Sequence, residues 1–196
     1  MGNVILGLLI ISPATLYALN KLFEQGISLF YSASLGSIRS ALTVLLDRAH
    51  VTVAESVDNG RTKKTYAITD AGRAAFIEWM LAPIASGNLE TIALSKLYLL
   101  GLLPADARAG ILEDITARTA RDLAQLEQLA VMLDSMEVPP EYREIFRYQR
   151  LTLEYGLMSH RAGREFFARV TAEEAPPSTT APPTRPAPPT PSTAPG

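Results

Sequence analysis

The sequence predicts a mainly α-helical protein with one short two-stranded hairpin in its N-terminal half. Apolar residues recur at helical spacing along most of the chain, whereas the period-two alternation of a strand is confined to residues 51–57 and 64–69. Apolar residues make up 47% of the 196 residues, which is enough to build a substantial core. The fold should therefore consist of packed helices to which the hairpin is attached.

The composition excludes several kinds of site. The chain contains no Cys, which excludes disulfides, thiolate metal sites and a Cys nucleophile. Its two histidines, His50 and His160, are far apart in sequence, so neither a His-rich metal site nor a His-based triad is expected. The sequence has no Gly-rich phosphate loop, no nucleophile elbow and no carboxylate pair in a recognisable context. We therefore expect a binding protein without metal or cofactor, and not an enzyme.

The first apolar segment, residues 4–11, is too short to cross a bilayer, which takes roughly 20 apolar residues. No basic residue precedes it and no small-residue cleavage site follows it, so a signal peptide is not expected. We interpret this segment as a buried helix, and we expect a cytoplasmic protein that makes no membrane contact.

Two changes in composition divide the chain. Residues 1–82 contain short elements, residues 83–172 contain long helical patterns, and residues 173–196 are largely Pro, Ala, Thr and Ser. The last segment cannot bury enough apolar surface to offset the entropy of ordering it. We therefore expect an N-terminal domain, a helical domain and a disordered tail with these bounds.

Local signals place three helices in the first fifty residues. The first covers residues 4–11, is apolar nearly all round and is stopped by a proline. The second begins after Thr15 and ends at Gly26, and the third begins after Ser34. The faces expected to be buried are Leu16, Leu19, Leu22 and Phe23 in the second helix and Ile38, Leu42, Leu45 and Leu46 in the third.

A hairpin and a fourth helix follow. Residues 51–57 alternate and are β-branched, Asp58-Asn59-Gly60 is a tight-turn signal, and residues 64–69 form the returning strand. Thr69 caps a helix that runs from residue 70 to about residue 81. The residues of this helix available for packing are Ala71, Ala74, Ala75, Trp79 and Met80.

Three helices, a hairpin with a basic tip and a further helix, in this order, are typical of a winged helix-turn-helix. In such a fold one helix enters the major groove of DNA, and cations on the hairpin reach phosphates or the minor groove. The N-terminus of the third helix also offers free amides and a positive dipole end to a phosphate. The predicted DNA contacts are Ser34, Ser37, Arg39, Ser40 and Thr43 from the third helix and Asn59, Arg61, Lys63 and Lys64 from the hairpin.

Several short motifs point to one family. They are Leu6-Gly7-Leu8-Leu9 with Pro13 and Tyr17, Gly36-Ser37-Ile38 with Ala41-Leu42, Gly60-Arg61 with Lys63-Lys64-Thr65-Tyr66, and Thr69-Asp70-Ala71-Gly72-Arg73. With these motifs the chain resembles the PadR family of winged-helix transcriptional regulators. The resemblance continues more weakly through Leu94-Ser95-Lys96-Leu97 to Glu154-Tyr155-Gly156 and covers about residues 3–170. It implies a homodimeric DNA-binding repressor that responds to a ligand or to stress and dimerises through its C-terminal helices.

The chain departs from the family pattern at three places. Leu16 stands where the family has Gly before the aromatic residue of the second helix. Arg39-Ser40 replaces the aromatic-Pro pair that follows Gly-Ser-Ile, and the usual Gly after the third helix is replaced near Ala49-His50. The aromatic residue of the aromatic-Pro pair commonly lies at the DNA surface in the family. Because it is replaced here, the resemblance predicts the fold more closely than the operator sequence. Arg39 could take a phosphate or a guanine in its place.

Three longer helical segments follow, at residues 89–103, 106–136 and 141–171. Long helices need tertiary packing to be stable. We expect the helical region to be an antiparallel dimerisation domain that pairs across a two-fold axis; packing on the chain's own N-terminal domain is the alternative. The expected apolar positions are Leu112, Ile115, Thr119, Leu123, Leu126, Leu129 and Leu133, interrupted by Asp122, and Tyr142, Phe146, Leu153, Leu157 and Phe167.

The resemblance also implies that some relatives bind aromatic compounds at the dimer interface. Candidates for lining such an effector cavity are Trp79, Tyr98, Phe146 and Tyr155, although these could also be ordinary core or interface aromatics.

The sequence thus predicts a homodimeric, sequence-specific regulator that binds double-stranded DNA, most simply a repressor released by a small molecule or a stress signal. The net charge of −2 gives little long-range attraction to a polyanion, so specificity should come from local contacts. The alternative is a winged-helix module that binds protein and not DNA.

Overall fold

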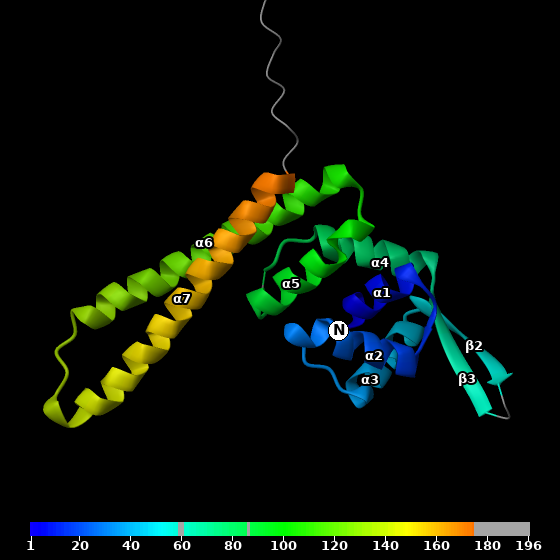
Figure 1. The fold of residues 1–196 in the computed structure, drawn as a ribbon, viewed down its shortest axis with the longest axis horizontal. Helices are drawn as coiled ribbons and strands as arrows, with labels where there is room; N and C mark the ends of the chain where they lie inside the picture. Colours follow the sequence, from blue (N-terminus) through cyan, green and yellow to red (C-terminus); the bar gives the residue numbers. More distant parts are fainter. Residues whose placement is uncertain (59–60, 86, 175–196) are drawn as a thin grey trace, which may run out of the picture.

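Two long helices, α6 (Ala105–Asp134) and α7 (Arg143–Glu174), extend from a body that the N-terminal elements build (Figure 1). A computed structural model describes residues 1–58, 61–85 and 87–174. Residues 173 and 174, the first two of the predicted tail, belong to α7, and the rest of the predicted tail lies outside the described residues. The mainly α fold with a winged helix and a helical C-terminal region is confirmed.

Helix α1 (Gly2–Ile11) lies at the centre of the body and contacts α3, α4 and α5. Its residues 4–9 are all buried, as its apolar sequence predicts. Gly7 lets these helices approach closely, because a Cβ atom there would lie 2.6 Å from Leu99 Cδ1 and 2.9 Å from a ring carbon of Phe76.

Helix α2 (Leu16–Gln25) begins at the predicted cap, where Thr15 Oγ1 accepts a hydrogen bond from the amide of Ala18. Leu19 and Phe23 are buried as predicted. Leu22 is 38% exposed, so the prediction that it is buried is wrong. A 3₁₀ turn, η1 (Ile27–Leu29), follows Gly26 and buries Ile27 in the core.

Helix α3 (Leu35–Asp47) has a reciprocal N-terminal cap. Ser34 Oγ accepts from the amide of Ser37, while the hydroxyl of Ser37 accepts from the amide of Ser34. The predicted stripe of Ile38, Leu42 and Leu45 is buried, and Leu46 is half-buried.

A Schellman motif ends α3. The amide of His50 donates to the carbonyl of Leu45 and the amide of Ala49 to that of Leu46, which requires Ala49 to adopt a φ of 54°. This is the place where the family usually has glycine, the residue that adopts positive φ without strain.

The hairpin is formed by β2 (Val51–Asp58) and β3 (Arg61–Ile68), so the returning strand starts three residues earlier than predicted. A two-residue strand, β1 (Ala14–Thr15), pairs with the base of β3 and completes a sheet of order β1-β3-β2. Two residues carry no detectable alternation, which explains why the sequence did not reveal β1.

Helix α4 (Asp70–Leu81) begins at the predicted cap, since Thr69 Oγ1 accepts from the amide of Gly72 at 3.0 Å. Phe76 and Met80 are its large buried side chains. The prediction that Ala71 and Ala74 pack inward is wrong, because both are exposed; Ala75 and Trp79 are half-buried.

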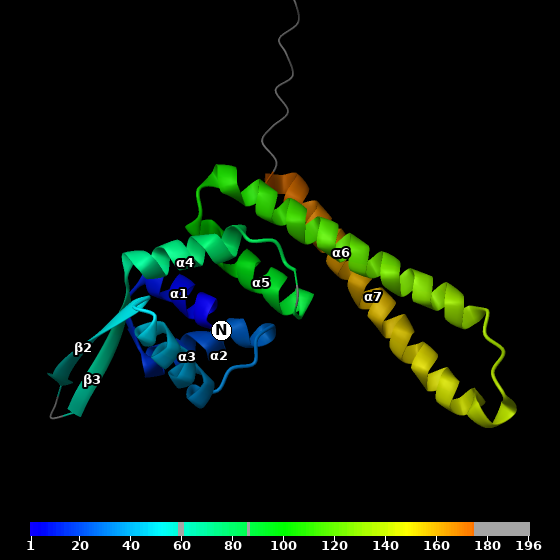
Figure 2. The same cartoon turned by 180° about the vertical axis from the view of Figure 1, so that it is seen from behind.

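The helical region matches the three predicted segments within a few residues. Helix α5 (Leu89–Leu99) continues into the 3₁₀ turn η2 (Leu100–Leu102), and η3 (Pro140–Tyr142) leads into α7. Helices α6 and α7 pack antiparallel along their length (Figures 1 and 2). Of the predicted positions, Leu112, Ile115, Thr119, Leu123, Leu153 and Phe167 are buried, Leu126, Leu133, Phe146 and Leu157 are half-buried, and Leu129 and Tyr142 are exposed.

A connector, residues 82–85, joins α4 to the helical region and is held by charged side chains. Lys96, which is only 3% exposed, donates to the carbonyls of Met80, at 3.1 Å, and of Ala82. Arg118 Nη1 donates to the carbonyl of Ile84 at 2.8 Å, and the Ile84 amide donates to Asp114 at 3.2 Å. The C-terminal end of α4 is therefore fixed to both α5 and α6.

Asp122, which interrupts the apolar positions of α6, forms an ion pair with Arg118 at 2.8 Å. Among the described residues, no helix is long and apolar enough to cross a membrane.

Candidate nucleic-acid interface

No other part of the chain that the structure describes covers the outward face of α3. Ser34, Arg39, Ser40 and Thr43 are exposed and Ser37 is half-buried. Figures 1 and 2 show α3 and the hairpin at the side of the body away from α6 and α7, which cover neither of them. Five of the nine predicted contacts therefore share one accessible helix.

The hydroxyl groups on this face are already bonded within the helix. Ser40 Oγ donates to the carbonyl of Gly36 at 3.0 Å, and Thr43 Oγ1 donates to that of Arg39 at 3.2 Å. Ser37 Oγ donates to the carbonyl of Ser34 at 2.8 Å. These oxygens remain able to accept a hydrogen bond, but their hydrogens are used.

The hairpin, or wing, carries Lys63 and Lys64, which are both exposed. Lys64 forms an ion pair with Glu55 at 2.8 Å, and this hydrogen bond and the charge of Glu55 raise the pKa of Lys64. Lys63 lies opposite Ser56 in the strand register. Of the two lysines, Lys63 is therefore the one that has no carboxylate opposite it in the strand pairing.

Two predicted contacts of the hairpin remain. Asn59 falls outside the described residues, and Arg61 begins β3 in register with Asp58. Glu55, the partner of Lys64, was not among the predicted site residues. Counting outward from a two-residue turn at 59–60 would have paired them, since antiparallel strands pair at fixed offsets from the turn.

The base of the wing is tied to the end of α3 and the start of α4. Thr69 donates from its amide to the carbonyl of His50 at 3.0 Å and from Oγ1 to that of Ala49 at 2.8 Å. The α4 backbone packs against the same segment, because Gly72 lies directly over the carbonyl of His50. These contacts fix the wing relative to α3.

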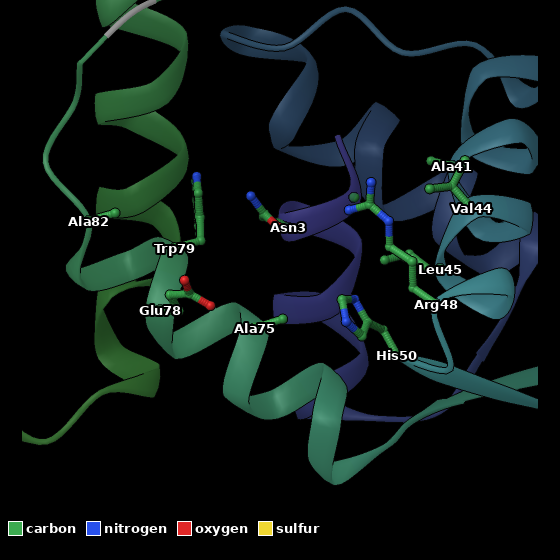
Figure 3. A pocket seen from close by; sticks show the side chains of 11 residues that line it. Asn3, Ala41, Val44, Leu45, Arg48, His50, Ala75, Glu78, Trp79 and Ala82 are labelled. Atoms are coloured by element: carbon green, nitrogen blue, oxygen red, sulfur yellow. The ribbon is translucent and has the colours of Figure 1, made fainter.

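An open groove of about 580 Å³ lies between α1, α3 and α4. Figure 3 shows Trp79 and Glu78 on one wall, Arg48 and His50 on the facing wall, and Asn3 between them. The groove is therefore lined by the indole ring of Trp79, the carboxylate of Glu78 and the guanidinium of Arg48.

The four predicted effector residues do not meet within one chain. Trp79 lines the groove, whereas Tyr98 packs against Phe30 with ring centroids 6.1 Å apart. Phe146 and Tyr155 lie on α7, and Tyr155 is 73% exposed. Their grouping stays a prediction about an assembly of two chains. The described part of the chain contains no cluster of three His, Asp or Glu side chains suited to a metal ion.

Residues 92–173 match the family described as "Virulence activator alpha C-term". No curated protein matches.

Solved structures match over most of the chain. Bacillus subtilis PadR in complex with operator DNA is 21% identical over 89% of this chain and 98% of that chain, with a TM-score of 0.42. The same protein in complex with p-coumaric acid is 20% identical over 88% and 94%, with a TM-score of 0.38. The Vibrio cholerae virulence activator AphA is 26% identical over 88% and 96%, with a TM-score of 0.37. The architecture predicted from the sequence is confirmed by the chain's own elements: a winged helix is followed by a helical C-terminal region.

Proposed function

We propose that this protein is a homodimeric, sequence-specific DNA-binding transcriptional regulator, and specifically a repressor that a small molecule or stress signal releases. The observation that carries the proposal is the accessibility of the outward face of α3 together with a wing fixed beside it. A helix of this kind fits the major groove, and wing cations reach the backbone. The similar Bacillus subtilis PadR, solved with operator DNA, supports this assignment.

The direct test is a mobility-shift assay with the DNA upstream of the protein's own gene, followed by selection of bound sequences from a random pool. A retarded complex and a two-fold-symmetric selected sequence are expected. If the full chain selects no DNA, the alternative of a winged-helix module that binds protein takes its place; the net charge of −2 and the Glu55–Lys64 ion pair favour that alternative.

Removing the charge of Lys63 should weaken binding to all DNA sequences. We expect Lys63→Ala to reduce the slope of log affinity against log salt by about one, because one phosphate contact releases about one counterion. Lys64→Ala should have a smaller effect, since Glu55 already offsets its charge. Glu55→Gln is the matched control: it should strengthen binding at low salt. Slopes unchanged in Lys63→Ala would contradict the assignment of the wing.

The homodimer is inferred from a second apolar face on α7. Tyr148, Leu151, Tyr155 and Met158 recur at helical spacing and are 47–73% exposed, on the side away from the buried Leu153. An exposed apolar stripe of this kind is typical of an interface. A homodimer would present two α3 helices, and the recognition helices of dimeric helix-turn-helix proteins meet successive major grooves roughly 34 Å apart.

A double substitution within this stripe, Leu151→Glu with Met158→Glu, should convert the dimer to a monomer. Two carboxylates placed in an apolar interface would lose their hydration without gaining partners. Light scattering at micromolar concentration gives the mass directly. Gln149→Glu, which adds one negative charge at an exposed position of α7 outside the stripe, should leave the dimer intact. A wild-type monomer would overturn the proposed dimer.

The effector is proposed to be an aromatic compound that binds beside Trp79, and the p-coumaric acid complex of Bacillus subtilis PadR supports this class. Trp79 is the single tryptophan of the chain, so its fluorescence reports on the groove directly. Titration with p-coumaric acid and related aromatic acids should shift the emission and release the DNA. If no compound of a broad panel changes the emission, the groove is not the effector site.

A further inference from the structure

The outward face of α3 is poor in hydrogen-bond donors. The hydroxyls of Ser37, Ser40 and Thr43 all donate to carbonyls within the helix or its cap. Arg39 is exposed and makes no hydrogen bond or ion pair within the described ranges, 1–58, 61–85 and 87–174. Its guanidinium is therefore the one uncommitted side-chain donor among the five predicted contacts of this helix.

We propose that Arg39 reads a guanine in the major groove of each half-site and sets the main base preference of the operator. This inference rests on the proposed DNA-binding function. Guanine presents two acceptors, O6 and N7, on its major-groove edge, and a guanidinium donates two parallel N–H groups in matching geometry. No other base offers two acceptors at this spacing, so the contact discriminates as well as attracts.

The position of Arg39 favours a base contact over a phosphate contact. Arg39 is the fifth residue of α3, in the N-terminal half of the helix, the half that contacts base edges in helix-turn-helix proteins. Gly36 and Ser40 lie beside it on the outward face, and both are small and exposed. A Cβ atom built on Gly36 would meet only Ser34 Oγ, at 3.8 Å. The helix backbone can therefore come close to the floor of the groove, within reach of the long Arg39 side chain.

The serine and threonine hydroxyls have a lesser role in this scheme. With their hydrogens held by the carbonyls of Ser34, Gly36 and Arg39, they can accept from a base amino group but cannot donate to guanine or thymine. Ser40→Ala should therefore leave the guanine preference unchanged, which separates the role of Arg39 from that of its neighbours.

The test is selection of bound DNA from a random pool with the full-length wild type, Arg39→Ala, Arg39→Lys and Ser40→Ala. Arg73→Ala is the matched control, because it removes the same charge from an exposed position of α4, outside the predicted DNA contacts. The wild type, Ser40→Ala and Arg73→Ala should select one guanine at a fixed place in each half-site. Arg39→Ala should lose the preference at that place alone and bind the wild-type operator about 10- to 100-fold more weakly. Arg39→Lys should recover affinity in part but discriminate less, because an ammonium lacks the planar fork.

A second measurement uses the selected operator with 7-deazaguanine at that place. Loss of N7 should weaken wild-type binding while leaving Arg39→Ala unaffected. If Arg39→Ala lowers affinity equally for all sequences and 7-deazaguanine weakens both proteins alike, Arg39 contacts phosphate and the inference is wrong. If the wild type selects no sequence, the proposed DNA-binding function fails first, a result distinct from failure of the Arg39 assignment.

Discussion

Gly72→Ala should destabilise the N-terminal body by about 3 kcal/mol or more, at the upper end of the range for overpacked sites. A Cβ atom at this position would lie 2.1 Å from the carbonyl oxygen of His50 and 2.9 Å from Ile68 Cγ1. The oxygen is backbone, and it also accepts the 3.0 Å hydrogen bond from the amide of Thr69. Relief of the clash would therefore move the end of α3 away from the start of α4 and release the wing.

Denaturant unfolding followed by circular dichroism measures this effect. The control is Gly110→Ala, because nothing lies within 4 Å of a Cβ atom there and the residue is exposed in the interior of α6. That substitution should stabilise the protein by about 0.5–1 kcal/mol through helix propensity alone. Equal stability of Gly72→Ala and the wild type would contradict the close packing at the base of the wing.

Lys96→Met should cost about 2 kcal/mol of stability, although a surface lysine would tolerate the same change. The ammonium donates to the carbonyls of Met80 and Ala82 at the end of α4, and methionine keeps the apolar stem but supplies no donor. A buried carbonyl left without a partner costs about 1–3 kcal/mol. Lys21→Met, on the exposed face of α2, should change the free energy of unfolding by less than about 0.5 kcal/mol. An equal effect at both positions would show that the hydrogen bonds of Lys96 contribute nothing.

Lys96 also makes the difference in unfolding free energy between the wild type and Lys96→Met depend on pH. Burial lowers the pKa of Lys96 below its ordinary value of 10.5, and the charge of Asp114 opposes the change in part. Just below pH 10.5 the unfolded chain holds the proton more tightly than the folded chain, so the stability contributed by Lys96 rises with pH through this window. The difference in unfolding free energy between wild type and Lys96→Met should therefore widen as pH increases.

Features fixed by local chemistry could be predicted from the sequence. The caps at Thr15, Ser34 and Thr69 were found because a cap bonds to an amide three residues away, so neighbouring residues suffice to recognise it. The positions of the helices followed from the same signals. The spacing of apolar residues also identified the buried stripe of α3.

Features that depend on distant contacts could not be predicted. Lys96 has the sequence context of a surface lysine, and only the approach of α4 makes its burial favourable. Ala71 and Ala74 are apolar, but α4 turns its bulkier residue Phe76 toward the core and leaves them in solvent. The predicted effector residues are spread over α4, α5 and α7, and the chain does not bring their four side chains to one pocket.

Because α6 is long, a small tilt where it is held moves its far end by a larger distance. The part of α6 beyond Arg118, residues 119–134, spans about 24 Å, so a tilt of one degree displaces its far end by about 0.4 Å. The helix is held in its first half, where Asp114 and Arg118 form hydrogen bonds with Ile84 of the connector. A tilt of a few degrees about this contact would therefore move the far end of α6 by about 1–2 Å. The hydrogen bonds to the connector thus set the direction in which the distal half of α6 points.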